Sequence, residues 1–223
     1  MLPAYHVRDA ARYAGVSVGT IHNWQRAQND FVPALAAREE RFSLSFLQLV
    51  ELRFVSAMRE AGIKLRAIRA AREYLAKAFK TEFPFADLRL KHNGQNIIVD
   101  LEETEGPVFR DIVLIADRGG QYSWKDIIGR KFDEFEYVDT IARRWYVGGK
   151  GSPILIDPHI AFGAPQVRGI PTWVIQNRHS GGESSKEIAE DFGLTQKLVK
   201  QALSFERRTT NNKNAQRKAW TTH

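Results

Sequence analysis

The segment ILIDPHIAFGAPQVRGIPTWVI, residues 154–175, places an acid, an imidazole and a guanidinium among glycines and prolines. Asp157, His159 and Arg168 are residue types that general acid–base chemistry uses. Because proline fixes φ and glycine permits sharp turns, these polar residues are expected at the ends of short strands. We predict that Asp157 is a turn residue whose carboxylate binds nearby backbone N–H groups. Arg168 is expected on a short strand, where it can meet a carboxylate of a partner protein.

The other reactive side chains form no recognisable catalytic or metal-binding pattern. The sequence has no Cys, which excludes disulfides, thiolate zinc sites and thiol catalysis. Its six His are scattered, and it lacks the Gly-rich phosphate loop and the G-x-S-x-G and H-E-x-x-H motifs. In FDEFEYVD, residues 132–139, acids alternate with aromatic residues, which indicates a strand with a solvated face rather than a metal site. We therefore expect no enzyme activity, no metal and no cofactor.

The composition is that of a globular protein with basic ends. Apolar residues make up 43 % and charged residues 26 %, which are ordinary values. The net charge of +7 is unevenly spread, because residues 1–79 and 151–223 are basic whereas residues 80–150 are slightly acidic. Basic ends suit polyanions or acidic surfaces. No apolar run is long enough to cross a membrane, and the first residues lack the order of a signal peptide, so a cytoplasmic protein is expected.

Residues 7–26 carry the pattern of a helix-turn-helix. Small apolar residues recur at helical spacing, and Gly15 follows where the turn needs an unhindered residue. Ser17 then stands at an N-cap position ahead of a second helix, whose Ile21 and Trp24 are expected to face the first. In a DNA-binding module the outward side of such a second helix lies in the major groove.

Two further helices are predicted, one from Ser43 or Ser45 to Met58 and one within residues 63–79. The stretches VRDAARYAGVSVGTIHNWQ and RFSLSFLQLVELRFVSAMREAGIKLRAIRAAREYL resemble the MerR-like winged-helix domain in the order of their elements. The resemblance implies a helix-turn-helix, a wing and a helix pair that bind DNA as a dimer. Where that family commonly has Pro-Arg and Arg-Tyr pairs, this chain has Val18-Gly19 and His22-Asn23, so other arginines are expected to share the phosphate contacts. The predicted DNA-contacting residues are Arg12, Ser17, Val18, Thr20, His22, Asn23, Arg26, Arg38 and Arg41.

The middle of the chain, residues 81–150, is predicted to be rich in strands. Asn93-Gly94 and Gly119-Gly120 are turn signals between apolar runs, as in hairpins. One helix is expected near residues 124–132.

A second helical hairpin is predicted in HSGGESSKEIAEDFGLTQKLVKQALSFERR, residues 179–208. Ser184 and Glu187 have the spacing of a capping box, Gly193 ends the first helix, and Thr195 caps the second. This hairpin also has a helix-turn-helix shape. DNA contact and partner or self-association both remain open for it, and the modest chemistry of its outward residues favours partner or self-association. Those residues are Gln196, Lys197, Lys200 and Gln201.

Residues 150–205 resemble the antitoxin-like domain-of-unknown-function family 433. The matching motifs are Asp157-Pro158, Gly163-x-Pro165, Ile170-Pro171 and Glu187-Ile188-Ala189, although the Gly-Thr-Arg usual before Ile-Pro is replaced by Arg168-Gly169. The resemblance implies an antitoxin of a type II toxin–antitoxin pair, whose partner is a toxin such as a PIN-like ribonuclease. Antitoxins of this kind lay a terminal segment across the toxin, and a basic tail can bind the clustered carboxylates of a nuclease site. The predicted toxin-contacting residues are Arg168, Arg207, Arg208, Arg217, Lys218 and Trp220.

The expected fold is α+β: an N-terminal winged helix-turn-helix, a strand-rich middle, and small C-terminal strands with a helical hairpin. The expected segments are residues 1–80, 81–150, 151–206 and the basic tail 207–223. The function expected from these features is that of a homodimeric antitoxin that neutralises a toxin and represses its own operon by binding operator DNA. The alternative is a MerR-type transcriptional regulator whose middle and C-terminal regions sense a small ligand.

Overall fold

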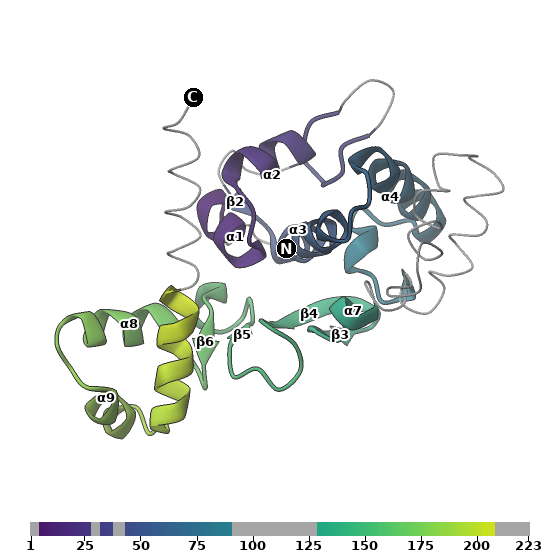
Figure 1. The fold of residues 1–223 in the computed structure, drawn as a ribbon. Coiled ribbons are helices and arrows are strands. Elements are labelled where there is room, and N and C mark those ends of the chain that lie inside the picture. The colour runs from purple at the N-terminus through teal and green to yellow at the C-terminus, as the bar shows by residue number, and fades with distance from the viewer. Residues whose placement is uncertain (1–4, 28–31, 38–42, 91–128, 208–223) are drawn as a thin grey trace, which may run out of the picture. The chain divides into compact units, whose positions relative to one another are not determined.

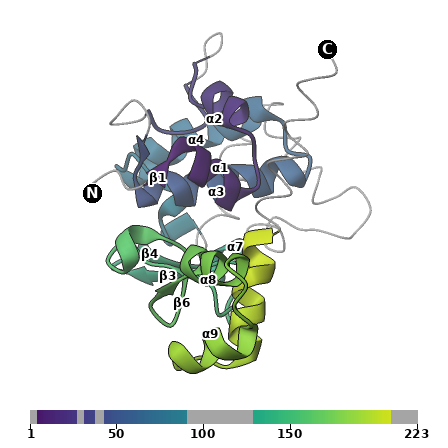
Figure 2. The same ribbon diagram turned by 90° about the vertical axis from the view of Figure 1, so that its left-hand side faces the viewer.

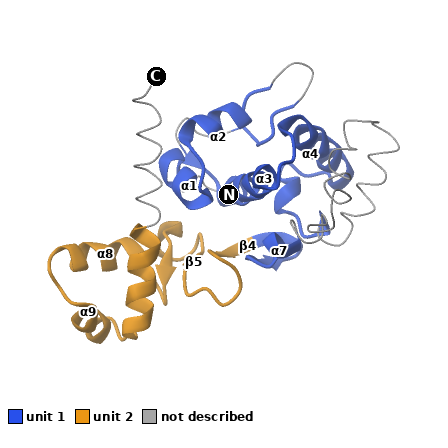
Figure 3. Ribbon diagram, viewed as in Figure 1, with its two compact units in different colours: residues 1–142 blue, residues 143–223 orange. Residues whose placement is uncertain are grey.

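The structure is a computed structural model, which describes residues 5–27, 32–37, 43–90 and 129–207. The chain divides into two compact units, residues 1–142 and 143–223 (Figure 3). Helices dominate the first unit, strands and helices share the second, and the predicted α+β class is confirmed (Figure 1). No described helix has the length and hydropathy that a membrane span requires. The segment boundaries predicted at residues 80, 150 and 206 stay predictions.

The first unit opens with a small helical module closed by two short strands. Strand β1 (Tyr5–His6) pairs antiparallel with β2 (Ser43–Leu44), and helices α1 (Val7–Ala14) and α2 (Val18–Trp24) lie between them in the sequence. The two helices and the turn at Gly15 stand where the sequence predicted them.

Two longer helices form the core of the first unit. Helix α3 (Phe46–Glu60) begins at a capping box, in which the Ser45 hydroxyl accepts the Gln48 N–H and the Gln48 side chain accepts the Ser45 N–H. Ser45 is therefore the cap, whereas the alternative Ser43 lies in β2. Helix α4 (Leu65–Phe79) follows the turn at Gly62 and buries one apolar side, as predicted.

The rest of the first unit is a short helical and hairpin region that packs on α3. It comprises η1 (Pro84–Ala86), α7 (Arg130–Phe132) and β3 (Phe135–Val138). The ring of Phe54 on α3 lies 4.7 Å from that of Phe132 and 5.5 Å from that of Phe135. Both turn signals predicted at 93–94 and 119–120 lie outside the described residues, and the helix predicted near 124–132 is described only as α7.

The acid-rich segment 132–139 forms the predicted strand, but one of its acids is not solvated. Glu134 is 7 % exposed and accepts hydrogen bonds from Lys131, at 2.6 Å, and from Arg53, at 3.4 Å. Its carboxylate thus ties α3 to the start of β3. No group of acidic or imidazole side chains that could hold a metal ion occurs within the described ranges.

A five-stranded antiparallel sheet runs in the order β3-β4-β5-β6-β7. Its last four strands are β4 (Ile141–Tyr146), β5 (Leu155–Ile156), β6 (Gln166–Val167) and β7 (Ile170–Pro171), and the boundary between the units falls within β4. Trp145 pairs with Ile156 across β4 and β5, and both side chains are buried. Between β5 and β6 lies the short helix η4 (Ala161–Gly163).

Arg168 lies in a turn, which corrects the prediction that it stands on a strand. Val167 pairs with Ile170, so Arg168 and Gly169 are the two central residues of the β6–β7 hairpin. Their φ angles are 49° and 85°, as the favoured two-residue hairpin turn requires. The guanidinium is consequently displayed at a hairpin tip.

Three helices complete the second unit: α8 (Thr172–Ser180), α9 (Ser185–Asp191) and a last helix described over residues 196–207. Helices α8 and α9 lie beside the last helix, drawn in yellow in Figure 2. The capping box of Ser184 and Glu187 and the cap at Thr195 are both present, as predicted. Helix α8 was not predicted from the sequence.

Candidate nucleic-acid interface

Helices α1 and α2 pack through small residues on one side and large residues on the other. Ala10 and Ala11 on α1 are 0 % and 3 % exposed, and Ile21 and Trp24 on α2 are 0 % and 6 % exposed. Small side chains on α1 let the two backbones approach closely, and the larger ones fill the angle between the helices. This buried contact fixes the direction in which α2 presents its other side.

The turn between the helices is held by specific hydrogen bonds. Gly15 has a φ of 74°, and the Val16 N–H donates to the Ala11 carbonyl at 2.9 Å, which closes the end of α1. The Ser17 hydroxyl oxygen accepts the Thr20 N–H at 2.9 Å and lies 2.8 Å from the Thr20 hydroxyl. Ser17 is therefore the cap of α2, as predicted, and this bonding places the Thr20 hydroxyl in the first turn of the helix.

Hydrogen bonds from α4 and from the loop after α2 hold the C-terminal end of α2. Arg69 on α4, only 3 % exposed, donates from its guanidinium to the Arg26 carbonyl at 3.1 Å. The Leu35 N–H donates to the Trp24 carbonyl at 3.2 Å. A cation at the C-terminal end of a helix also complements the helix dipole. Arg69 is thus a positioning residue for α2.

The residues predicted to contact DNA fall into three groups. Asn23 on α2 and Arg26, two residues after its end, are exposed, whereas Ser17, Val18, Thr20 and His22 are half-buried. Arg12 lies against its own helix, with its guanidinium carbon 5.0 Å from the centroid of the Tyr13 ring. Arg38 and Arg41 lie outside the described residues. Helix α2 and the residue after its C-cap therefore carry an amide, a hydroxyl, an imidazole and a guanidinium, a set that can bond base edges and phosphates.

Removal of the Ser17 hydroxyl is expected to loosen this module. Ser17→Ala leaves the Thr20 N–H without its side-chain acceptor and should lower the free energy of unfolding by about 1 kcal/mol. Chemical denaturation followed by helical circular dichroism measures this loss. Ser17→Asp, which retains a capping oxygen, is the matched control and should unfold close to the wild type; equal stability of the Ala variant would contradict the capping role.

The segment that contains Asp157 forms a structural cluster rather than a catalytic one. The carboxylate accepts the His159 backbone N–H at 2.8 Å, as predicted, and also accepts Nε of Arg144 at 2.7 Å. Burial opposes ionisation of Asp157, but the hydrogen bonds from Arg144 and His159 outweigh it and hold its pKa below the ordinary value. The ion pair links β4 to the turn after β5, so the charged carboxylate stabilises the sheet.

The residues predicted to contact a toxin are described only in part. Arg168 and Arg207 are exposed, whereas Arg208, Arg217, Lys218 and Trp220 lie outside the described residues. Two exposed aromatic side chains of the second unit were missed: Phe162 on η4, 94 % exposed, and Trp173 on α8, 52 % exposed. Sequence patterns assign aromatic residues to the core, so only the structure shows that these two face solvent.

Comparisons with known proteins agree with this division of the chain. Residues 5–75 match the family described as MerR HTH family regulatory protein, and residues 154–205 match the family described as Protein of unknown function (DUF433). A Mycobacterium tuberculosis protein named "Putative antitoxin VapB45" is 24 % identical over 225 residues, covering 91 % of this chain and 93 % of that protein. The crystal structure of Rv2018 from Mycobacterium tuberculosis matches with a TM-score of 0.76 and 22 % identity, covering 91 % of this chain and 98 % of that one.

Helix-turn-helix geometry over α1 and α2 thus coincides with the MerR match, and the segment from β5 into the last helix coincides with the DUF433 match. The chain therefore joins an N-terminal MerR helix-turn-helix domain to a C-terminal domain of the DUF433 family.

Proposed function

We propose that this protein is the antitoxin of a type II toxin–antitoxin pair. Its first unit binds operator DNA and represses its own operon, and its second unit, with the basic tail, binds and neutralises a toxin of the PIN-like ribonuclease class. The geometry of α2, capped by Ser17 and held by Arg69, carries the DNA-binding half of the proposal. The toxin-binding half draws on the similarity to a named antitoxin over nearly the whole chain.

A homodimer is part of the proposal. A single α2 reads one half-site, and two copies related by twofold symmetry cover two half-sites about one helical turn apart. Size measurement of the protein on its upstream DNA, by light scattering, is expected to give two chains per duplex.

Co-purification with the product of the adjacent gene tests the toxin-binding half. The neighbour should be toxic when expressed alone, harmless when co-expressed, and captured as a stable complex with suppressed nuclease activity. A harmless neighbour that forms no complex would contradict this half. Upstream DNA binding that responds to a small molecule, without a captured protein, would support the ligand-sensing regulator.

Substitutions on α2 and at Arg26, two residues after it, test the DNA-binding half. Arg26→Ala should weaken binding to all duplexes several-fold. It should also make the negative slope of log K against log salt concentration shallower by about 1, as expected for one lost phosphate contact. Thr20→Ala and Asn23→Ala should instead change which bases are preferred. Titrations of fluorescent upstream DNA at several salt concentrations measure both effects. Arg130→Ala, which removes an exposed arginine from α7, is the matched control. If Arg26→Ala leaves affinity and slope unchanged, the placement of α2 on DNA is wrong.

A further inference from the structure

The turn before the last helix repeats three backbone and capping hydrogen bonds of the turn before α2. When Gly193 is aligned with Gly15, the bond from the Leu194 N–H to the Ala189 carbonyl, 2.8 Å, matches that from Val16 to Ala11, 2.9 Å. Both glycines have positive φ, 62° and 74°.

The caps of the two second helices match in the same alignment. The Leu198 N–H donates to the Thr195 hydroxyl at 3.3 Å, as the Thr20 N–H donates to Ser17. The Thr195 and Ser17 carbonyls each accept the N–H four residues later at 3.2 Å. The chain therefore contains two helix-turn-helix turns of the same construction, one in each unit.

The buried side chains correspond as well. Ile188 and Ala189 take the places of Ala10 and Ala11, and Val199 takes the place of Ile21; all are at most 4 % exposed. Because the inward positions coincide, the outward positions of the last helix are fixed by the same alignment.

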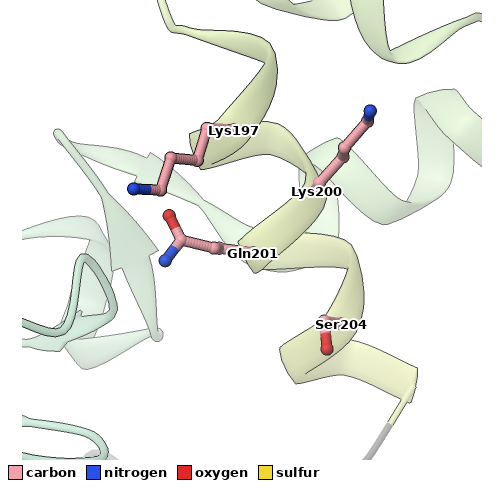
Figure 4. A pocket seen from close by; sticks show the side chains of 4 residues that line it. All are labelled: Lys197, Lys200, Gln201 and Ser204. Atoms are coloured by element: carbon pink, nitrogen blue, oxygen red, sulfur yellow. The ribbon is translucent and has the colours of Figure 1, made fainter.

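The outward positions of the last helix carry cations and hydrogen-bonding groups. In place of Gly19, His22, Asn23 and Arg26 stand Lys197, Lys200, Gln201 and Ser204. These four side chains project from one helix and line an open pocket of about 460 Å³ (Figure 4). The side that corresponds to the DNA-facing side of α2 is thus the hollowed, basic side of this helix.

We infer that the helix over residues 196–207 is a second DNA-reading helix, which enters the major groove of duplex DNA. Lys197 and Lys200 supply ammonium groups for phosphates or guanine edges, and Gln201 supplies an amide that can bond adenine in the bidentate manner. The side chains alone favoured partner or self-association, but the turn and cap that match those of α2 favour duplex DNA. The inference goes beyond the proposed function and does not depend on toxin binding.

The acids of α9 and of the last helix are engaged within the unit. On α9, Glu187 completes the capping box, Glu190 pairs with Lys186 at 3.9 Å, and Asp191 bonds Arg178. On the last helix itself, Glu206 is buried and accepts the Thr172 hydroxyl at 2.6 Å. Among the described residues no carboxylate forms an ion pair with Lys197 or Lys200, so their charge is displayed to an incoming polyanion.

Salt-dependent binding of the full-length chain tests the inference. Lys197→Gln combined with Lys200→Gln is expected to make the negative slope of log K against log salt concentration shallower by about 2, because two counterion-releasing contacts are lost. The probe is a duplex that spans the gene's own upstream region. Lys150→Gln combined with Lys186→Gln removes two exposed lysines elsewhere in the second unit and should leave the slope unchanged.

Photo-cross-linking separates the two reading helices. A benzoylphenylalanine placed at Gln201 is expected to cross-link to the duplex, and one placed at Asn23 reports the first unit independently. Cross-links from 201 without those from 23 would support this inference while contradicting the proposed role of α2. An unchanged salt slope without DNA cross-links from 201 would overturn the inference, as would cross-links from 201 to a co-expressed protein instead of DNA.

Discussion

Replacement of Phe162 by Asn, or of Trp173 by Gln, is expected to weaken the complex with the proposed toxin by at least about 2 kcal/mol, or roughly 30-fold in Kd. Both side chains are large and exposed, and buried aromatic anchors account for much of the binding energy at protein interfaces. Phe162 has a φ of 54°, a conformation costly for a bulky residue. A strained backbone that holds an aromatic ring in solvent is the kind of feature that binding, not folding, explains.

The replacements are chosen to preserve the fold. Asn tolerates the left-handed conformation at position 162, and Gln suits the helix at position 173. Val138→Thr, which removes an apolar side chain that is 50 % exposed on β3 in the first unit, is the matched control. Kd measured by calorimetry on the purified pair should change for the two aromatic variants and not for the control. Unchanged affinity in both would place the toxin surface elsewhere on the chain.

Local signals allowed much of the N-terminal module to be predicted. Gly15, Ser17 and the spacing of Ile21 and Trp24 act within a few residues of one another, so the turn and both helices could be placed from the sequence. The same holds for Ser45, Ser184 and Thr195, since a capping bond links residues three apart.

Helix α8 could not be placed by such signals. Its first residues, TWVI, are β-branched or aromatic, which favours a strand. No side chain caps its N-terminal end, and only Thr172 and Ile175 are buried. Instead the Thr172 hydroxyl bonds Glu206, a contact between residues far apart in sequence. Long-range contact decides the structure here, and with it the exposure of Trp173.

Buried charges are the second feature that spacing could not show. Arg66, Arg69 and Arg72 recur along α4, a pattern that predicts a solvated surface, yet Arg69 and Arg72 are 3 % and 9 % exposed. Glu51 occupies a position on α3 that is 0 % exposed. Each is buried because a partner from another element meets it, and those partners are set only by the folded chain. The placement of α2 depends on one of them.

The pH dependence of the free energy of unfolding is expected to show that the buried Glu51 carboxyl is protonated in the folded chain. Its carboxylate accepts the Phe85 N–H at 3.4 Å and lies 3.7 Å from Nε of Arg72. Burial raises the pKa of Glu51 from 4.5 to about 7, although Arg72 and backbone N–H groups act in the opposite direction. The folded chain therefore holds this proton at pH values where the unfolded chain has released it.

The stability that protonated Glu51 contributes is fully present below pH 4.5 and is lost as the pH rises to about 7. Over that interval the free energy of unfolding of the wild type should fall by about 3 kcal/mol relative to Glu51→Gln, whose side chain does not titrate. Urea denaturation at a series of pH values measures the difference. Glu73→Gln, at a half-buried site on α4 where the carboxylate pairs with Lys77, should follow the wild type. If the wild type instead gains stability over the interval, attraction to Arg72 outweighs burial, and Glu51 is ionised in the folded chain.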